Sequence, residues 1–290
     1  MSAESKSLSI ISLGVSCQTA MQIRHHAKLI ASLTGEDVEI AGEELEGSTF
    51  PFDWRIMPAD AFCWMAENRQ FFPKTPFELS RRIGEWPVDV PPHWDDSNSI
   101  FWHDFKVTEV AWDVEKTFDV TAEKYRYTTE KFLNRTKRSI FILSNTQNNL
   151  KSVVTDVVGL KFDFDRKLIT RVRRSLEALF PKLDIELIVV AAPDRVRDDV
   201  RQWPAEAYVL DQSHLSPDDV RGDADKWEAI FHDYFARFPS APAKRPAAKP
   251  LAAMRRLLRD WQARLKGEQI KSGAGQTINS GDHNQIPTGD

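Results

Sequence analysis

Short apolar runs alternate with helical patterns over the first 240 residues of the chain. Runs of strand length occupy residues 8–13, 139–144, 185–191 and 207–210. Apolar residues at helical spacing predict helices over about 17–34, 58–72, 122–137, 165–180 and 223–238. Strands separated by helices of this length are typical of a parallel sheet. The pattern therefore predicts an α/β fold of three layers, a mostly parallel sheet with helices on both faces.

The stretches between these elements are less regular. We expect a loop over 36–48, irregular surface over 84–99, and a strand over 100–107 that carries His103.

The last fifty residues have a different composition. Residues 241–250 are rich in Pro, Ala and Lys and predict an extended linker. Residues 251–267 place apolar side chains on one helix face with Arg and Lys beside them, and residues 268–290 are polar and predicted to be disordered. We therefore expect one domain over 1–240, followed by a linker, a basic amphipathic helix and a tail. That helix would dock on a protein, stay solvated, or contact an anionic membrane surface weakly.

Composition and charge exclude several classes of protein. The chain has 290 residues, and no run approaches the roughly 20 apolar residues of a membrane-spanning helix. The whole chain carries −4, residues 241–268 carry +6 and residues 269–290 carry −1, so residues 1–240 carry −9. An acidic body argues against nucleic acid as a partner. Two cysteines and a polar N-terminus without a secretion signal favour the cytoplasm. No metal-ligand spacing or Gly-rich phosphate loop occurs, so we expect no metal and no cofactor.

Cys17 is the main candidate for chemistry. It follows a Gly-containing turn after the first strand, on the first turn of the predicted helix. Unpaired amides and the dipole of a helix start favour a thiolate, and the same amides suit an oxyanion. The alternative is that Cys17 is a small buried core residue, which is the interpretation we adopt for Cys63.

A thiol nucleophile needs a base and a group that orients it. His103 lies between aromatic residues, which favours a neutral imidazole that accepts a proton. Asp53, flanked by Pro and aromatics, is a candidate for the third member of a triad. The alternatives are a structural histidine and an aspartate that caps the local turn.

A second arrangement is also present. Asp211 and His214 follow the last predicted strand, and Asn145 and Asn148 follow an earlier one. A nucleophile after the first strand with an Asp-x-x-His pair after the last resembles the layout of SGNH-type hydrolases. The Gly-Asp-Ser opening of those enzymes is absent, and the matching stretch, residues 13–17, reads LGVSC.

Three motifs resemble a bacterial family described as papain-like cysteine peptidases, which has no assigned function beyond that name. They are SLGVSC at 12–17, PFDW at 51–54 and HDF at 103–105, and the likeness covers roughly residues 8–190. The resemblance implies Cys17 as the nucleophile and His103 as the base; Asp53 lies in a matching motif. It also implies a papain-like α+β fold, as an alternative to the parallel sheet. The Cys-Gly-Ser-Cys-Trp signature of papains is missing, and no Gln precedes Cys17 at the usual place.

These observations predict a thiol-dependent hydrolase or acyl transferase. Cys17 would attack a carbonyl of a peptide or another amide or ester, His103 would accept and return the proton, and Asp53 would orient His103. The alternatives are the SGNH-like layout with Asp211 and His214, and a non-catalytic module. Such a module would bind peptide or glycan through the tryptophans between residues 50 and 112.

Overall fold

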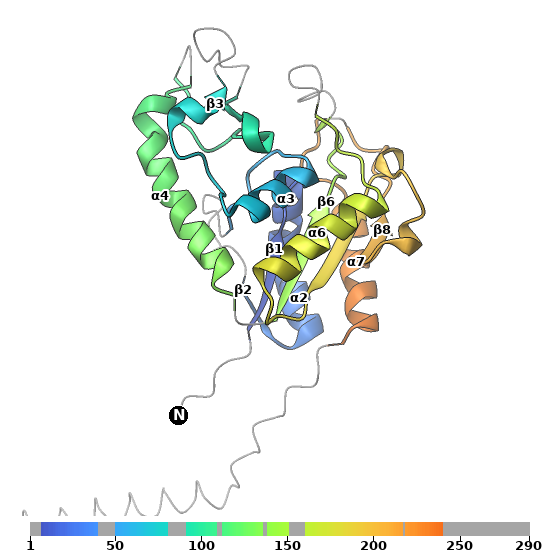
Figure 1. The fold of residues 1–290 in the computed structure, drawn as a ribbon. Coiled ribbons are helices and arrows are strands. Elements are labelled where there is room, and N and C mark those ends of the chain that lie inside the picture. Colours follow the sequence, from blue (N-terminus) through green and yellow to red (C-terminus); the bar gives the residue numbers. More distant parts are fainter. Residues whose placement is uncertain are drawn as a thin grey trace, which may run out of the picture. The chain divides into compact units, whose positions relative to one another are not determined.

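The computed structural model of the chain describes residues 7–39, 50–80, 91–108, 112–135, 138–150, 160–216 and 218–239. Its centre is a sheet of five parallel strands in the order β2-β1-β6-β7-β8 (Figure 1). The strands are β1 (Ser7–Ser12), β2 (Asp37–Glu39), β6 (Ser139–Ser144), β7 (Glu186–Ala191) and β8 (Glu206–Val209). The parallel pairing confirms the predicted α/β class, and the papain-like alternative with an antiparallel central sheet is wrong.

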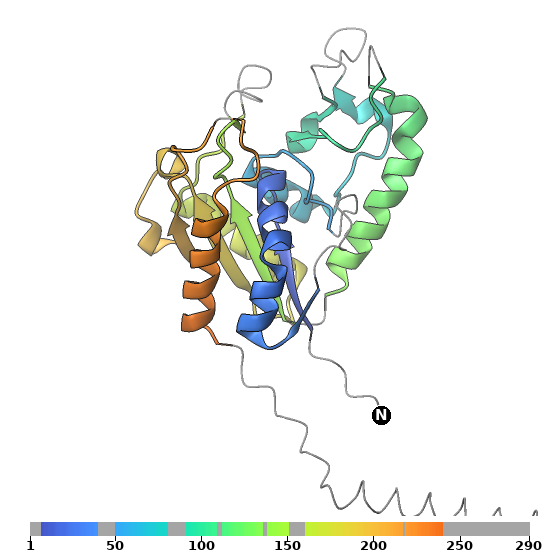
Figure 2. The same cartoon turned by 180° about the vertical axis from the view of Figure 1, so that it is seen from behind.

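Helices cover both faces of this sheet. Helices α1 (Cys17–His25), α2 (Ala27–Thr34) and α7 (Ala224–Arg237) pack together on the face seen in Figure 2. Helices α3 (Ala59–Asn68), α4 (Val114–Leu133) and α6 (Arg166–Leu179) cover the opposite face (Figure 1). The predicted three-layer arrangement is therefore the one observed.

Burial on both faces explains why the strands read as continuous apolar runs. In β6 the side chains of Ile140 and Ile142 join the core under α1, α2 and α7. Phe141 and Leu143 join the larger core under α3, α4 and α6. All four are fully buried, and burying one such side chain stabilises the fold by about 1.5–3 kcal/mol. Successive side chains of a strand point to opposite faces, so only an unbroken apolar run fills both cores.

Local capping signals set the ends of several helices. Asp165 accepts a hydrogen bond from the Leu168 backbone N–H at 2.7 Å, and Asp223 caps α7 through the Lys226 N–H at 3.1 Å. The helix predicted over 17–34 is two helices, because the chain breaks at His26, which is buried against Phe231 of α7.

The region between α3 and α4 differs most from expectation. It forms a small antiparallel sheet of β3 (Leu79–Ser80), β4 (His93–Trp94) and β5 (Ser99–Ile100), where we expected irregular surface. The strand predicted over 100–107 stops at Ile100, and the chain then bends so that Phe101 and Phe105 pack against each other, with ring centroids 5.6 Å apart. Short 3-10 helices lie at Pro76–Glu78, Asp95–Ser97, Pro193–Arg195 and Val200–Gln202.

Two predictions concern parts of the chain that are only partly described. The loop expected over 36–48 begins with β2, an edge strand too short to stand out in the sequence, and residues 40–49 lie outside the described residues. The linker, basic helix and tail predicted after residue 240 also lie outside them. None of the helices in the described ranges is long and apolar enough to cross a membrane.

Candidate functional site

The strand order defines where a ligand site belongs in this sheet. From β1 the chain continues to β2 on one side, and from β6 it continues to β7 on the other. In an open parallel sheet the crevice at such a reversal, at the carboxyl ends of the strands, is the usual ligand site. Cys17 and Gln18 follow β1 at this point, and residues 145–148 follow β6.

A tight turn delivers Cys17 to this crevice. Gly14 and Val15 both have left-handed backbone, with φ of 83° and 43°. A non-glycine residue such as Val15 seldom adopts left-handed backbone. Its carbonyl accepts a hydrogen bond from the Met57 N–H at 3.0 Å. Ser16 occupies the N-cap position but makes no capping hydrogen bond, so its side chain satisfies none of the first amides of α1. The turn therefore places the thiol at an N-terminus that has no side-chain cap.

The surroundings of Cys17 change one expectation about its chemistry. Its side chain is 6% exposed, and its Sγ lies 3.8 Å from Oε1 of Gln147. Burial raises the pKa of Cys17 to about 11, whereas we expected the helix start to lower that pKa. Desolvation outweighs the dipole here because the thiol is enclosed. The resting thiol is therefore protonated at neutral pH, and a base must take its proton during any attack.

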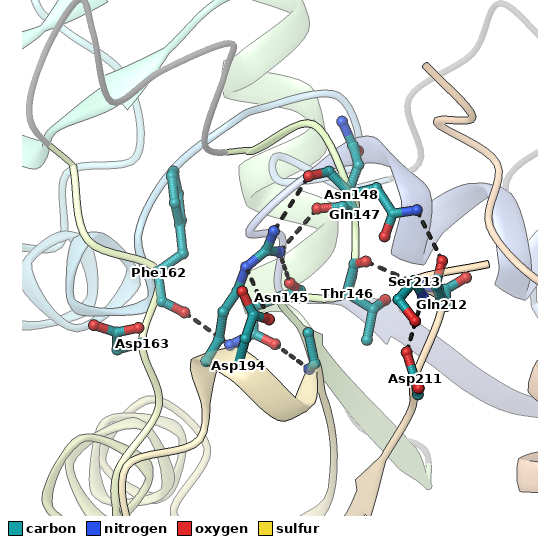
Figure 3. Close-up of polar contacts among 12 residues, drawn as sticks. Asn145, Thr146, Gln147, Asn148, Phe162, Asp163, Asp194, Asp211, Gln212 and Ser213 are labelled. Carbon is teal, nitrogen blue, oxygen red and sulfur yellow. Dashed lines mark hydrogen bonds and ion pairs between the residues drawn. The ribbon is translucent and has the colours of Figure 1, made fainter. Parts of the chain in front are cut away.

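Arg195 holds the loop after β6, whose residues Asn145, Thr146, Gln147 and Asn148 are labelled in Figure 3. The guanidinium donates to the carbonyls of Asn145 and Gln147, the latter at 2.8 Å, and to that of Asn148 at 3.4 Å. The Asn145 carboxamide donates to the Phe162 carbonyl at 2.7 Å and accepts from the Ala192 N–H at 2.9 Å. The Asn145 side chain therefore links the end of β6 to the segment before α6 and to the end of β7.

Two loops meet at the side chain of Gln18, which lies on the first turn of α1. Its Oε1 accepts from Thr146 Oγ1 at 2.6 Å and from Gln212 Nε2 at 3.2 Å. Its Nε2 donates to the Val220 carbonyl at 3.3 Å. Gln18 therefore ties the ends of β1, β6 and β8 together. Gly222 lies against this junction with φ of 81°, and a Cβ there would lie within 2.8 Å of the carboxamides of Gln18 and Gln212.

The pair predicted after the last strand is arranged differently from expectation. Asp211 accepts the Ser213 N–H at 2.9 Å, while His214 pairs with Asp223, Nε2 to Oδ2, at 3.0 Å. Asp223 donates its own N–H to Gln212 at 2.6 Å, and Gln212 bonds Gln18. The His214–Asp223 pair is thus linked through two hydrogen bonds to the residue beside Cys17.

His103 and Asp53 belong to a neighbouring cluster. The imidazole of His103 packs edge-on against Trp54, with centroids 5.8 Å apart, and Trp54 also contacts the guanidinium of Arg24 at 4.9 Å. Asp53 is buried, accepts the Phe50 N–H at 3.1 Å and pairs with Arg24 at 3.6 Å. Asp53 therefore holds its turn, the alternative role that the sequence left open.

The structure does not join the three predicted catalytic residues by direct contact. Arg24 lies seven residues after Cys17, which is about 10 Å along α1. Within the part of the chain that the structure describes, no hydrogen bond links His103 to Cys17 or to Asp53. Desolvation lowers the pKa of His103, so its imidazole is neutral at neutral pH. The catalytic roles of His103 and Asp53 stay predictions.

Sequence reasoning missed the residues that build the site. Gln18 and Gln212 had no distinguishing spacing, and Arg195 reads as one of many charged loop residues, although it is 4% exposed. Asp223 carried a signal as the N-cap of a predicted helix, but nothing connected it to His214. Only the sheet order brings these side chains together.

Two further findings bear on the class of protein. In the described ranges, no group of three or more His, Cys, Asp or Glu side chains is arranged to hold a metal ion. None of the described tryptophans between residues 50 and 112 is exposed; they are Trp54, Trp64, Trp94, Trp102 and Trp112.

Comparisons of the chain with protein-family models, curated proteins and solved structures give no match. The assignment of a function therefore rests on the fold and the site.

Proposed function

We propose that the protein is a thiol-dependent hydrolase or acyl transferase with Cys17 as its nucleophile. The observation that carries this proposal is the place of the thiol. Cys17 is the first residue of α1, at the reversal point between β1 and β6, and it contacts Gln147 of the opposite loop. In parallel α/β folds this is where ligands bind. The SLGVSC, PFDW and HDF motifs, which resemble those of papain-like cysteine peptidases, support the same nucleophile.

The buried thiol determines how the reaction would start. Because its pKa is raised to about 11, Cys17 attacks as a thiol whose proton leaves as the carbon–sulfur bond forms. The carbonyl oxygen of the substrate then becomes an oxyanion, which backbone N–H groups at the start of α1 would stabilise. The leaving alcohol or amine takes the proton back. A water or a second nucleophile releases the acyl group.

Two imidazoles are candidates for the base. His103 is the one that the motif resemblance indicates, and its lowered pKa keeps it neutral and able to accept a proton. His214 is favoured by a specific observation, since its partner Asp223 is linked through Gln212 to Gln18, next to the nucleophile. An Asp–His pair after the last strand is the arrangement of the SGNH-like alternative, with Asp223 in the place expected for Asp211.

The substrate class follows from the proposed chemistry. The substrate is a peptide or another amide or ester, because attack by a thiol needs an acyl carbon. Both described cysteines are free, and a reactive thiol persists in a reducing compartment, which supports the cytoplasm. The non-catalytic alternative needs an exposed aromatic platform, and no tryptophan of the described region supplies one.

Turnover of activated esters and peptide amides tests the proposal. Wild type is compared with Cys17→Ala and with Cys63→Ala, a matched control because Cys63 is fully buried in the core. We expect turnover that Cys17→Ala abolishes and Cys63→Ala retains. Adding His103→Ala and His214→Ala identifies the base as the variant that loses about 10²–10⁴-fold in rate. Equal rates in wild type and Cys17→Ala would overturn the proposal.

A further inference from the structure

Arg195 makes an unusual set of contacts for a buried arginine. Its guanidinium donates to three backbone carbonyls of the loop after β6, those of Asn145, Gln147 and Asn148 (Figure 3). The carboxylate that pairs with it, on exposed Asp194, lies 3.9 Å from Nε. Its positive charge is therefore directed into the peptide groups of one loop.

The direction of these carbonyls fixes the direction of the neighbouring N–H groups. Every described peptide bond is trans, so the C=O and N–H of one peptide group point opposite ways. The Gln147 carbonyl faces Arg195, so the Asn148 N–H points away from Arg195. The Thr146 carbonyl accepts from Gln212 at 3.1 Å, which turns the Gln147 N–H away from Gln212.

These two N–H groups belong to consecutive residues and are not used in hydrogen bonds among the described residues. Successive backbone N–H groups in a turn form an anion-binding concavity, and a turn begins at Asn148. The side chain of Gln147 contacts the thiol of Cys17, so this concavity belongs to the loop that faces the nucleophile.

We propose that Arg195 is the positioning residue of the acyl-transfer site. By holding the Gln147 carbonyl, it presents the Asn148 N–H, beside the Gln147 N–H that Gln212 orients, to the oxyanion that forms when Cys17 attacks a carbonyl. This inference rests on the proposed function of Cys17 and adds to the N–H groups at the start of α1. Arg195 acts through the loop and does not touch the substrate.

The chemistry of the guanidinium explains why an arginine occupies this position. Its planar fork donates from two nitrogens to three acceptors, which an ammonium group does not reproduce in the same geometry. A cation that binds the carbonyl end of a peptide group also polarises the N–H end, which strengthens the bond that this N–H donates. Donors fixed in advance cost no rearrangement when the negative charge develops.

Two probes separate this role from simple stabilisation of the fold. With p-nitrophenyl acetate, the sulfur of Cys17 bonds to the acetyl carbon, the carbonyl oxygen becomes an oxyanion, and p-nitrophenolate leaves while the thiol proton passes to base or solvent. With iodoacetamide, the sulfur bonds to the methylene carbon, iodide leaves and the thiol proton passes to base or solvent, so no oxyanion forms. The ratio of the two rates at Cys17 therefore reports the oxyanion site and cancels changes in thiol exposure or pKa.

The experiment measures this ratio at Cys17 in the full chain, read by peptide mass spectrometry. The variants are Arg195→Met, Arg195→Lys and the control Arg197→Met, which removes an exposed arginine two residues away. We expect the ratio to fall about 10²-fold in Arg195→Met, as when one oxyanion donor is lost. It should fall several-fold in Arg195→Lys, which keeps the charge but loses the fork, and stay unchanged in Arg197→Met.

The outcomes distinguish the inference from the proposed function. If wild-type Cys17 is alkylated but never acylated, the proposed function fails. If wild type is acylated and the ratio is the same in Arg195→Met, or both rates fall equally, the positioning role is wrong. Should Arg195→Met fail to fold, as shown by circular dichroism, Arg195→Lys decides, because an unchanged ratio there overturns the inference.

Discussion

Substitution of Gly222 by Ala tests whether the hydrogen bonds of Gln18, which join α1 to the loops after β6 and β8, hold the site together. The residue has φ of 81°, and an L-residue in the left-handed region costs about 1–2 kcal/mol. The new Cβ would also lie 2.6 Å from Oε1 of Gln212 and 2.7 Å from Nε2 of Gln18. Both carboxamides are buried, so one of them must move and lose a hydrogen bond, at a cost of about 1–3 kcal/mol.

The expected loss in free energy of unfolding is therefore about 2–5 kcal/mol, measured by urea denaturation. Gly35→Ala is the matched control, because Gly35 ends α2 with φ of 64° and a Cβ there would have no neighbour within 4 Å. It should lose only the backbone component, about 1–2 kcal/mol. We also expect Cys17 to be alkylated faster in Gly222→Ala and unchanged in Gly35→Ala. Equal losses of stability in the two variants would show that the Gln18 junction is not tightly packed.

Two more predictions concern buried polar groups elsewhere in the fold. Asn145→Ala should lower the free energy of unfolding by about 2–4 kcal/mol, because the carbonyl of Phe162 and the N–H of Ala192 lose their partner. A midpoint of urea denaturation within about 0.2 M of the wild-type midpoint, the error of such a fit, would contradict this. Burial lowers the pKa of His26, so the unfolded chain binds a proton at about pH 6.5 that the folded chain refuses. The stability of wild type relative to His26→Leu is therefore full above pH 6.5 and should fall below it, by at most about 1.4 kcal/mol per pH unit; a difference constant from pH 5 to 8 would refute it.

The parallel sheet was predictable because its strands carry a strong local signal. Residues buried on both faces are mostly apolar, so β6 was predicted at its observed bounds and β7 within one residue of its observed start. Asp165 and Asp223 are the first residues of the helices predicted over 165–180 and 223–238, and each caps its own helix in the structure. Such local interactions leave a mark in the sequence.

The site was predictable only in part, because most of its contacts join residues far apart in the chain. Cys17 was found from its place after a strand and a turn. The partners of Gln18, Thr146 and Gln212, lie 128 and 194 residues away, and no local pattern marks them. The pKa of the thiol depends on burial, which the dipole of α1 alone did not reveal. The pairing of His214 with Asp223 likewise depends on how the loop after β8 folds back.

The most direct measurement of the central claim is the identity of the residue that becomes acylated. Wild-type protein is mixed with p-nitrophenyl acetate at pH 7.5, quenched in acid within the first turnover, digested and mapped by mass spectrometry. The account predicts an acetyl group on Cys17, with none on Cys63, and its disappearance as the acyl-enzyme turns over. Acetylation confined to surface lysines, or equal on both cysteines, would contradict the assignment of Cys17 as the nucleophile.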